Sequence, residues 1–205
     1  YGISFNVGSQ ASNVMAWAEA IKSLVPIFES LKRSGIEIEM INFGGGYPCE
    51  YASTEEKLLL QDIAKYALEE YSKLSFKPKI FLEPGRGVVG DTAILVSTVI
   101  ARVERQQSTW LFLDSGAYNA LFEAMAYQGS TRYRVTSLRK SFDSGEMMYA
   151  LAGPTGDSQD VITKEALLPR DIDVGDKLVF HNVGAYNLVA ITPFNGFPKP
   201  DVYVE

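Results

Sequence analysis

Apolar and polar positions follow two different patterns along the chain, and the change falls near residue 90. Before it, short apolar runs at residues 3–7, 37–43 and 79–82 alternate with longer segments whose apolar residues recur at helical spacing. This order of strand, helix, strand, helix and strand, with helices long enough for right-handed crossovers, predicts a parallel sheet. The apolar positions that mark the two helices are Trp17, Ile21, Leu24, Phe28 and Leu31, then Leu59, Ile63, Ala67 and Tyr71.

Both predicted helices carry residues that favour helix ends. Ser12 or Asn13 can cap the first helix, and Gly35 stands where that helix should end. Ser53 and Glu56 form a capping box ahead of the second helix. These signals place each helix between two of the predicted strands.

Past residue 90 the sequence is rich in β-forming residues, and Gly, Pro, Asn and Asp separate the runs. This pattern predicts an antiparallel sheet or a small barrel, with a helical turn at residues 121–127. We therefore expect α/β structure over residues 1–90, followed by a β domain over residues 91–205. The β-rich runs are residues 93–103, 109–113, 147–151, 177–180, 188–191 and 202–204.

Composition limits the classes of function. The chain has 205 residues, 46% of them hydrophobic and 21% charged, as in an ordinary globular protein. A net charge of −6 without a Lys/Arg cluster argues against a nucleic-acid partner. The longest apolar run, residues 93–101, is too short to cross a bilayer, so no membrane partner is expected. The single cysteine, Cys49, excludes an internal disulfide and fits a cytoplasmic setting, and no metal-ligand spacing is present.

The glycine triplet (Gly44, Gly45 and Gly46) directly follows the second predicted strand. Glycines there let the backbone approach an anion closely and point successive N–H groups at it. The spacing differs from the G-x-G-x-x-G dinucleotide pattern. Taken alone, such a triplet is more often a tight turn than a phosphate site.

The third predicted strand ends in Glu-Pro-Gly-Arg, which places Glu83 and Arg86 at one strand tip. In isolation this pattern is more often a surface ion pair than a functional site. The carboxyl ends of neighbouring parallel strands meet at one edge, however, so Arg86 can bind a phosphate beside the glycine triplet. Ser9, after the first strand, adds a hydroxyl at the same edge.

Five motifs in this order resemble the fold type III pyridoxal-phosphate decarboxylases of ornithine, lysine, arginine and diaminopimelate. The resemblance implies an alanine-racemase-like (β/α)8 barrel, of which this chain would hold the last three strands. A C-terminal β-barrel or sandwich domain would follow, and the extreme C-terminus could rejoin the barrel. The motifs are residues 44–48 (Gly-Gly-Gly-Tyr-Pro), 83–86 (Glu-Pro-Gly-Arg), 153–155 (Gly-Pro-Thr), 184–186 (Gly-Ala-Tyr) and 194–197 (Phe-Asn-Gly-Phe).

The resemblance also implies roles for single residues. Glu83 would face the pyridine nitrogen of pyridoxal phosphate and keep it protonated, which favours loss of carbon dioxide. Racemases on this fold have an arginine there, so Glu83 disfavours a racemase. Asp157 and Phe194 would reach the substrate in the other subunit of a homodimer with shared active sites. The residues expected to hold the cofactor phosphate are Ser9, Gly44, Gly45, Gly46, Arg86 and Tyr186.

Several positions depart from the family pattern. Asn6 stands where the family has the histidine that stacks on the pyridine ring, and Gly156 stands where it has a cysteine that returns a proton to the substrate. The acid that meets the distal amine of the substrate is replaced by Ala126 or Tyr127. These changes predict that the substrate is an amino acid or derivative other than plain ornithine.

None of the lysines matches the family's Schiff-base lysine, whose strand would precede Tyr1. We therefore expect the chain to correspond to the C-terminal half of a decarboxylase and to be inactive alone. The alternative is a non-catalytic homologue that acts as a binding or regulatory protein, because the histidine, the cysteine and the acid are lost together. An amino-acid racemase is a third, weaker reading.

Overall fold

Three short parallel strands form the centre of the N-terminal part in the computed structural model, which describes residues 1–51, 60–126 and 133–204. They are β1 (Gly2–Ser4), β2 (Met40–Asn42) and β3 (Lys79–Phe81), in that order across the sheet. Backbone hydrogen bonds continue past the strand ends, from Phe5 N–H to the Asn42 carbonyl (3.1 Å) and from Phe43 N–H to the Phe81 carbonyl (2.9 Å). The predicted parallel sheet is confirmed.

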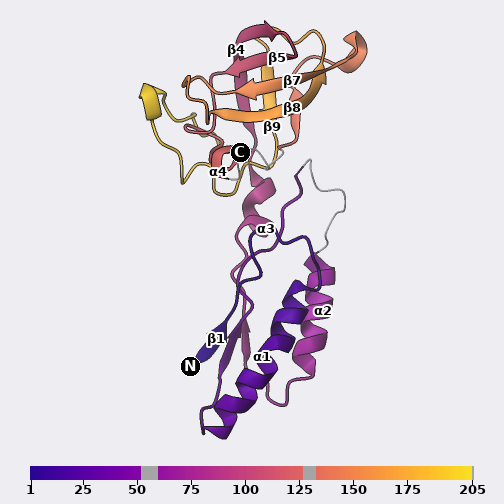
Figure 1. The fold of residues 1–205 in the computed structure, drawn as a ribbon, viewed down its shortest axis with the longest axis vertical. Coiled ribbons are helices and arrows are strands. Elements are labelled where there is room, and N and C mark those ends of the chain that lie inside the picture. The colour runs from indigo at the N-terminus through magenta and orange to yellow at the C-terminus, as the bar shows by residue number, and fades with distance from the viewer. Residues whose placement is uncertain (52–59, 127–132, 205) are drawn as a thin grey trace. The chain divides into compact units, whose positions relative to one another are not determined.

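Helices α1 (Ala16–Arg33) and α2 (Leu60–Ser72) pack side by side along this sheet (Figure 1). Most of the apolar positions predicted from the helical spacing are buried in one core with Ile41 of the central strand, and Leu24 and Tyr71 pack against its margin. Leu59 lies outside the described residues. Burying this apolar surface is what holds two amphipathic helices against three short strands. The buried core of this unit consists of Trp17, Ile21, Phe28, Ile41, Phe43, Ile63, Ala67 and Leu74.

The predicted cap of the first helix is borne out in part, at Asn13. Helix α1 begins after Met15, which has no side-chain cap, while the Asn13 side chain accepts the Met15 N–H at 2.9 Å in the turn before it. At the other end Gly35 has φ +73°, a left-handed conformation that glycine adopts without strain, so the predicted end is confirmed. The proposed capping box, Ser53 and Glu56, lies outside the described residues.

The second part is built on one six-stranded sheet in the order β6-β9-β4-β5-β7-β8. Figure 1 shows this part as the mainly β portion of the chain. All pairs are antiparallel except β5 with β7, and the sheet curls until β6 and β8 lie beside one another. The predicted helical turn is present as α4 (Phe122–Ala126). The strands are β4 (Leu95–Arg105), β5 (Ser108–Leu113), β6 (Val135–Ser137), β7 (Glu146–Ala152), β8 (Val161–Pro169) and β9 (Lys177–Phe180).

Two predicted strands do not form, and two others were missed. Residues 188–190 lie in a turn closed by the Ala190 N–H and the Asn187 carbonyl, and Ile191 follows it without regular structure. Residues 202–204 are exposed and form no strand. The long strand β8 was missed because its alternation is interrupted where register shifts occur against β7. Strand β6 has only three residues, too few for a periodic signal.

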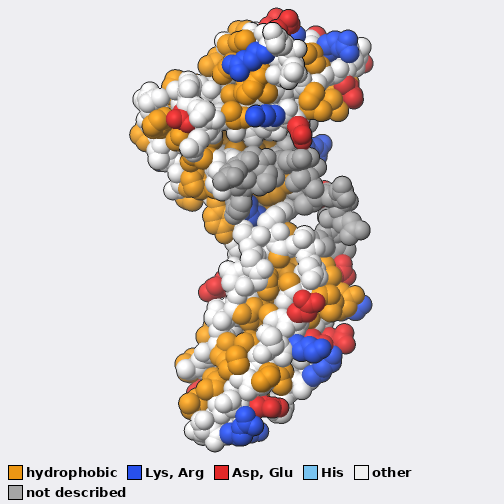
Figure 2. All heavy atoms as spheres, viewed as in Figure 1, with side chains coloured by type: hydrophobic (Ala, Val, Ile, Leu, Met, Phe, Trp, Pro, Cys, Tyr) orange, Lys and Arg blue, Asp and Glu red, His pale blue; other side chains and the backbone are white. Residues whose placement is uncertain are grey.

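The described chain forms two compact units, residues 1–50 with 60–88, and Tyr51 with residues 89–204. None of the described helices is long and apolar enough to cross a membrane. On the face drawn in Figure 2, charges of both signs lie among exposed apolar side chains. The exposed apolar residues include Phe81 and Leu82 in the first unit and Ile94, Val96 and Ile100 in the second.

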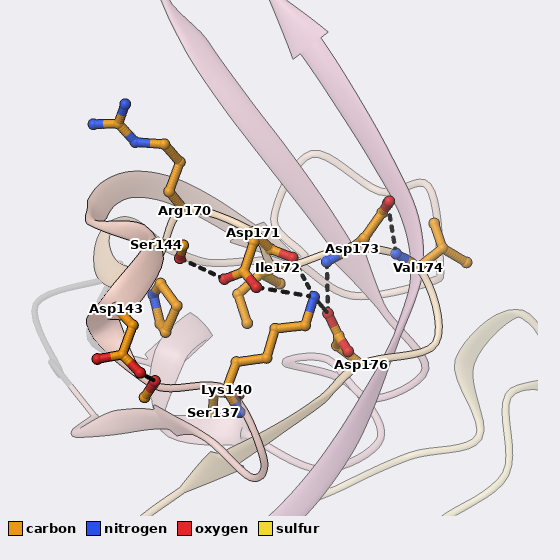
Figure 3. Close-up of polar contacts among 12 residues, drawn as sticks. Ser137, Lys140, Asp143, Ser144, Arg170, Asp171, Ile172, Asp173, Val174 and Asp176 are labelled. Atoms are coloured by element: carbon orange, nitrogen blue, oxygen red, sulfur yellow. Dashed lines mark hydrogen bonds and ion pairs between the residues drawn. The ribbon is translucent and has the colours of Figure 1, made fainter.

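A charged cluster ties the turn between β8 and β9 to the segment after β6 (Figure 3). The Lys140 ammonium lies 2.8 Å from an Asp176 carboxylate oxygen and 3.6 Å from one of Asp171. Lys140 also donates to the Asp171 carbonyl, and Ser144 donates its hydroxyl to the Asp171 carboxylate at 2.7 Å. The hydrogen bond to Asp176 raises the pKa of Lys140, and the hydrogen bond from Ser144 lowers that of Asp171.

We predict that this cluster shapes the pH dependence of stability. The Lys140 contribution is complete below its unfolded pKa of about 10.4 and is lost as pH rises through its higher folded pKa. The Asp171 contribution is complete above about pH 4 and is lost as pH falls through its lowered folded pKa. Lys140→Met should lower Tm near neutral pH and make the alkaline fall of Tm shallower, as measured by thermal unfolding. Lys164→Met, an exposed change on β8, is the control, and an unaltered alkaline limb in Lys140→Met would contradict the prediction.

Candidate functional site

The loops that follow β1, β2 and β3 meet at one edge of the first sheet. The glycine triplet belongs to the loop after β2 and lies between the loops after β1 and β3. A Cβ added to Gly44 would lie 2.0 Å from the Phe5 carbonyl oxygen, and one added to Gly46 would lie 2.3 Å from the Gly8 carbonyl oxygen. Both glycines also have positive φ, +65° and +93°. Only residues without a side chain fit this close backbone approach.

Gln10 fixes the first of these loops against the second. Its side-chain amide donates to the Cys49 carbonyl at 2.5 Å and accepts the Cys49 N–H at 3.0 Å, as a backbone strand would. Beside it, the Ala11 N–H donates to the Gly46 carbonyl at 3.0 Å. Sequence reasoning missed Gln10, and Cys49 is a buried packing residue in this arrangement.

Arg86, the first residue of α3 (Arg86–Val89), is 5% exposed. Its Nη2 lies 3.4 Å from the Ser9 hydroxyl oxygen, so the guanidinium reaches from the third loop to the first. A buried arginine beside a backbone cradle supplies the charge and the bidentate donors that an anion such as phosphate requires. The structure therefore brings Ser9, Arg86 and the glycine triplet to one edge of the sheet.

Glu83 lies exposed at the same edge, directly after β3. The Asn42 amide nitrogen donates to the Glu83 carboxylate at 3.1 Å, while the Asn42 amide oxygen accepts the Gly44 N–H at 2.9 Å. The Glu83 N–H donates to the Gly44 carbonyl at 3.0 Å. Asn42 thus orients the carboxylate relative to the glycine triplet, a role that its position at a strand end did not reveal.

Asn6 lies in the first loop, where its side-chain oxygen accepts the Gly8 N–H at 2.8 Å. The amide group is therefore held close to its own backbone by an Asx turn. It is exposed at the edge where the triplet lies, and it offers a flat polar group rather than a titratable one.

These residues fit a phosphate-bearing cofactor with a protonated ring nitrogen. The glycine cradle leaves backbone within reach of an anion, the Arg86 guanidinium supplies positive charge, and the Glu83 carboxylate supplies an acceptor held in place by Asn42. Within the described residues no group of three or more His, Cys, Asp or Glu side chains could hold a metal ion.

A second group of candidate residues lies at one end of the β sheet. Tyr118 and Phe194 stack with ring centroids 4.3 Å apart, and Asn195 donates to the Thr155 carbonyl at 3.0 Å. Desolvation and then the negative charge of Asp157 raise the pKa of Tyr118, so this phenol stays protonated at neutral pH. The structure thus brings Asp157 and Phe194 together around Tyr118, which sequence reasoning did not assign to the site.

Gly156 has φ +76°, and a Cβ added to it would meet no atom within 4 Å. The missing side chain therefore leaves open space, although any other residue would be strained there. Ala126 is exposed at the end of α4, and Tyr127 lies outside the described residues.

Tyr186 stands on a separate turn, with φ +58° and 51% of its surface exposed. The next residue anchors this turn, because the Asn187 amide donates to the Val183 carbonyl (3.1 Å) and accepts the Tyr133 hydroxyl (2.9 Å). The adjacent Glu123 carboxylate, 1% exposed, accepts a hydrogen bond from the Tyr51 hydroxyl at 3.0 Å. This buried polar group was also missed from the sequence.

We predict that Gly44→Ala destabilises the protein more than an ordinary glycine substitution at positive φ. Gly35→Ala has the same backbone penalty but open space around its Cβ, so it should cost about 1 kcal/mol. Gly44→Ala adds an overlap with the Phe5 carbonyl and should lower Tm further. Thermal unfolding of both variants measures the difference. Equal losses of Tm would show that the loops separate without cost.

Known proteins resemble this chain along almost its whole length. Residues 1–90 match the family model described as pyridoxal-dependent decarboxylase, pyridoxal binding domain. The chain is 29% identical to a diaminopimelate decarboxylase of Archaeoglobus fulgidus over 97% of its length and 47% of the relative's. It is 30% identical to Antizyme inhibitor 2 of Xenopus laevis over 98% of its length and 46% of that protein's.

A solved structure of lysine/ornithine decarboxylase complexed with cadaverine, from Vibrio vulnificus, shares the fold. It has a TM-score of 0.84 and 30% identity, over 97% of this chain and 53% of that one. The chain thus spans about half the length of the curated relatives it matches. Family model, relatives and fold agree in supporting the fold type III pyridoxal-phosphate-dependent decarboxylase family for this chain, with the pyridoxal binding domain matched over residues 1–90.

Proposed function

We propose that the protein carrying this chain decarboxylates an amino acid, or an amino-acid derivative other than plain ornithine, with pyridoxal phosphate as cofactor. The observation that carries the proposal is the Glu83 carboxylate, held by the Asn42 amide beside the glycine triplet. This acid, the backbone cradle and the buried Arg86 form a set suited to that cofactor. A protein without catalytic function has no physical need for all three together.

Each residue at this edge has a proposed role toward the cofactor. The glycine triplet, Ser9 and Arg86 bind the phosphate, and Tyr186 of the β domain contributes its hydroxyl. Asn6 would pack its flat amide against the ring, where it cannot carry a proton. Glu83 would accept a hydrogen bond from the ring nitrogen and keep that nitrogen protonated.

The proposed chemistry follows from the charge on Glu83. The C–C bond to the substrate carboxyl group breaks, and carbon dioxide leaves. The electron pair of the broken bond remains on the substrate carbon. Pyridoxal phosphate, when bound, would supply the electron-withdrawing ring that stabilises this electron pair. Glu83 strengthens this withdrawal by holding the proton on the ring nitrogen, which favours decarboxylation over racemisation.

Asp157 and Phe194 are proposed to contact the substrate in the active site of a second subunit, so that the enzyme is a homodimer. Asp157 offers a carboxylate to a polar or cationic group, and Phe194 offers an apolar face already stacked on Tyr118. Gly156 leaves room for a bulkier substrate and provides no thiol. Water or a group on the substrate then returns the proton to the substrate carbon.

We further propose that β1, β2 and β3 are the last three strands of an alanine-racemase-like (β/α)8 barrel. The chain matches about half of its relatives' length, which supports this assignment. A part of the protein outside this chain would then supply the Schiff-base lysine, and these 205 residues alone would be inactive.

A regulatory protein without activity is the second candidate. It is favoured by a 30% identical relative that is named an inhibitor of antizyme rather than an enzyme, and by the absence of the thiol at Gly156. Retention of Glu83, Arg86 and the glycine triplet argues against it. Carbon dioxide release separates the two candidates.

We predict that Glu83→Gln lowers kcat of the complete enzyme about 100-fold or more, because a neutral amide cannot hold the ring nitrogen protonated. Cofactor binding, followed by absorbance, should remain close to that of the unmodified enzyme because the phosphate contacts are unchanged. Glu69→Gln, on the exposed surface of α2, is the matched control. No carbon dioxide release from any amino acid by the unmodified protein would favour the regulatory candidate.

We predict that larger conjugated amino acids are better substrates than ornithine, lysine, arginine or diaminopimelate. Gly156→Ala introduces a side chain at φ +76° and so measures the effect of backbone strain alone. Gly156→Cys causes the same backbone strain and also supplies a thiol. Only Gly156→Cys should improve the proportion of correctly protonated product, measured by chromatography of the amine. Efficient turnover of plain ornithine by the unmodified enzyme would rule out a changed substrate.

A further inference from the structure

We propose that Asp160 and Thr155 are positioning residues that set the place of Asp157 through a buried chain of hydrogen bonds. The inference rests on the proposed function, in which Asp157 contacts the substrate. Its starting point is that Asp160 is 1% exposed. A carboxylate buried to this extent cannot reach a substrate directly, and it is retained only where donors satisfy its oxygens.

The Asp160 carboxylate joins two loops of the β domain. Its Oδ1 accepts the Ala117 N–H at 2.7 Å, from the loop that follows β5. Its Oδ2 accepts both the N–H of Thr155 at 3.1 Å and the hydroxyl of Thr155 at 2.7 Å, from the loop that follows β7. One side chain therefore fixes the spacing between the loop that carries Tyr118 and the loop that carries Asp157.

Two glycines make room for this carboxylate. A Cβ added to Gly116 would lie 2.2 Å from Asp160 Oδ1, and one added to Gly153 would lie 2.4 Å from either carboxylate oxygen. Neither glycine needs a positive φ, so their function here is space rather than backbone freedom. The Gly-Pro-Thr motif is thus fitted closely around Asp160.

Thr155 links the buried Asp160 carboxylate to the backbone of Asp157. Its hydroxyl oxygen, which donates to Asp160, also accepts the Asp157 N–H at 3.3 Å. The Asp157 carbonyl accepts the Asp160 N–H at 3.0 Å, which closes the turn. The Thr155 carbonyl accepts the Asn195 amide, so the segment that carries Phe194 depends on the same residue. Asp157 and Phe194 are consequently placed by one buried group.

The alternative is that Asp160 only stabilises the fold. A structural role predicts that variants lose Tm and cofactor binding together, and that the kinetic constants of the surviving enzyme hardly change. A positioning role predicts a rise in KM for substrates with a distal polar or cationic group, because Asp157 is displaced. The KM for substrates without such a group should not rise.

The test uses Thr155→Val and Thr155→Ser in the complete enzyme. Valine keeps the shape but removes the hydroxyl, whereas serine keeps the hydroxyl. Thr155→Val should raise KM for a distally charged substrate about tenfold, within the hundredfold that misplacement by about 1 Å can cost. Thr155→Ser should restore the KM. Asp160→Asn should have the larger effect, because in either orientation its amide nitrogen would face a backbone N–H donor, that of Ala117 or that of Thr155.

Thr163→Val is the matched control, since it removes a local hydrogen bond to the Glu165 N–H on β8, outside this chain of hydrogen bonds. A second readout does not need activity: amide hydrogen exchange over residues 155–158 should accelerate in Thr155→Val and Asp160→Asn but not in the control. An unchanged KM and unchanged exchange in Thr155→Val would overturn the inference, as would an equal rise of KM for all substrates. If the unmodified protein releases no carbon dioxide, the proposed function fails, and the exchange experiment alone then decides whether the loop is positioned in this way.

Discussion

Direct contact between backbones, without intervening side chains, is the constraint on which the first unit depends. Three parallel strands bring their carboxyl ends to one edge, and the glycine triplet lets the loop after β2 lie against the Phe5 and Gly8 carbonyls. At the same edge Arg86 reaches Ser9, and the Asn42 amide reaches Glu83. The candidate cofactor contacts of this unit therefore lie at that edge.

Three acidic residues show how environment assigns different tasks to one chemical group. Glu83 is exposed and held by a single amide, so its carboxylate is available to a ligand. Asp160 is buried, and its oxygens are occupied by backbone and hydroxyl donors, so it acts on its neighbours. Asp171 lies in an exposed ion-pair cluster, where its contribution to stability depends on pH. Burial and the number of donors, rather than residue type, separate these roles.

The residues of the candidate site that could be predicted are those that form short consecutive motifs. The function of the glycine triplet and of the Glu83–Arg86 segment can be inferred from neighbouring residues alone. Glycine permits close backbone approach, and the end of a strand exposes its charged side chains. Gln10, Asn42 and Asn187 could not be found in this way. Their partners lie 39, 41 and 54 residues distant in sequence, and a lone amide has no periodic or motif signal.

The sequence by itself determined the order of strands and helices in the first unit, because apolar spacing directly reflects which side chains face a core. It also determined the end of α1 at Gly35 and the β-rich character of the second unit. Only the tertiary structure decided the parallel pairing of β5 with β7, the register shifts of β8 and the failure of residues 188–191 and 202–204 to form strands. Strand pairing depends on which distant backbone segment satisfies each N–H and C=O group. The hydrophobic pattern of one segment does not identify that partner.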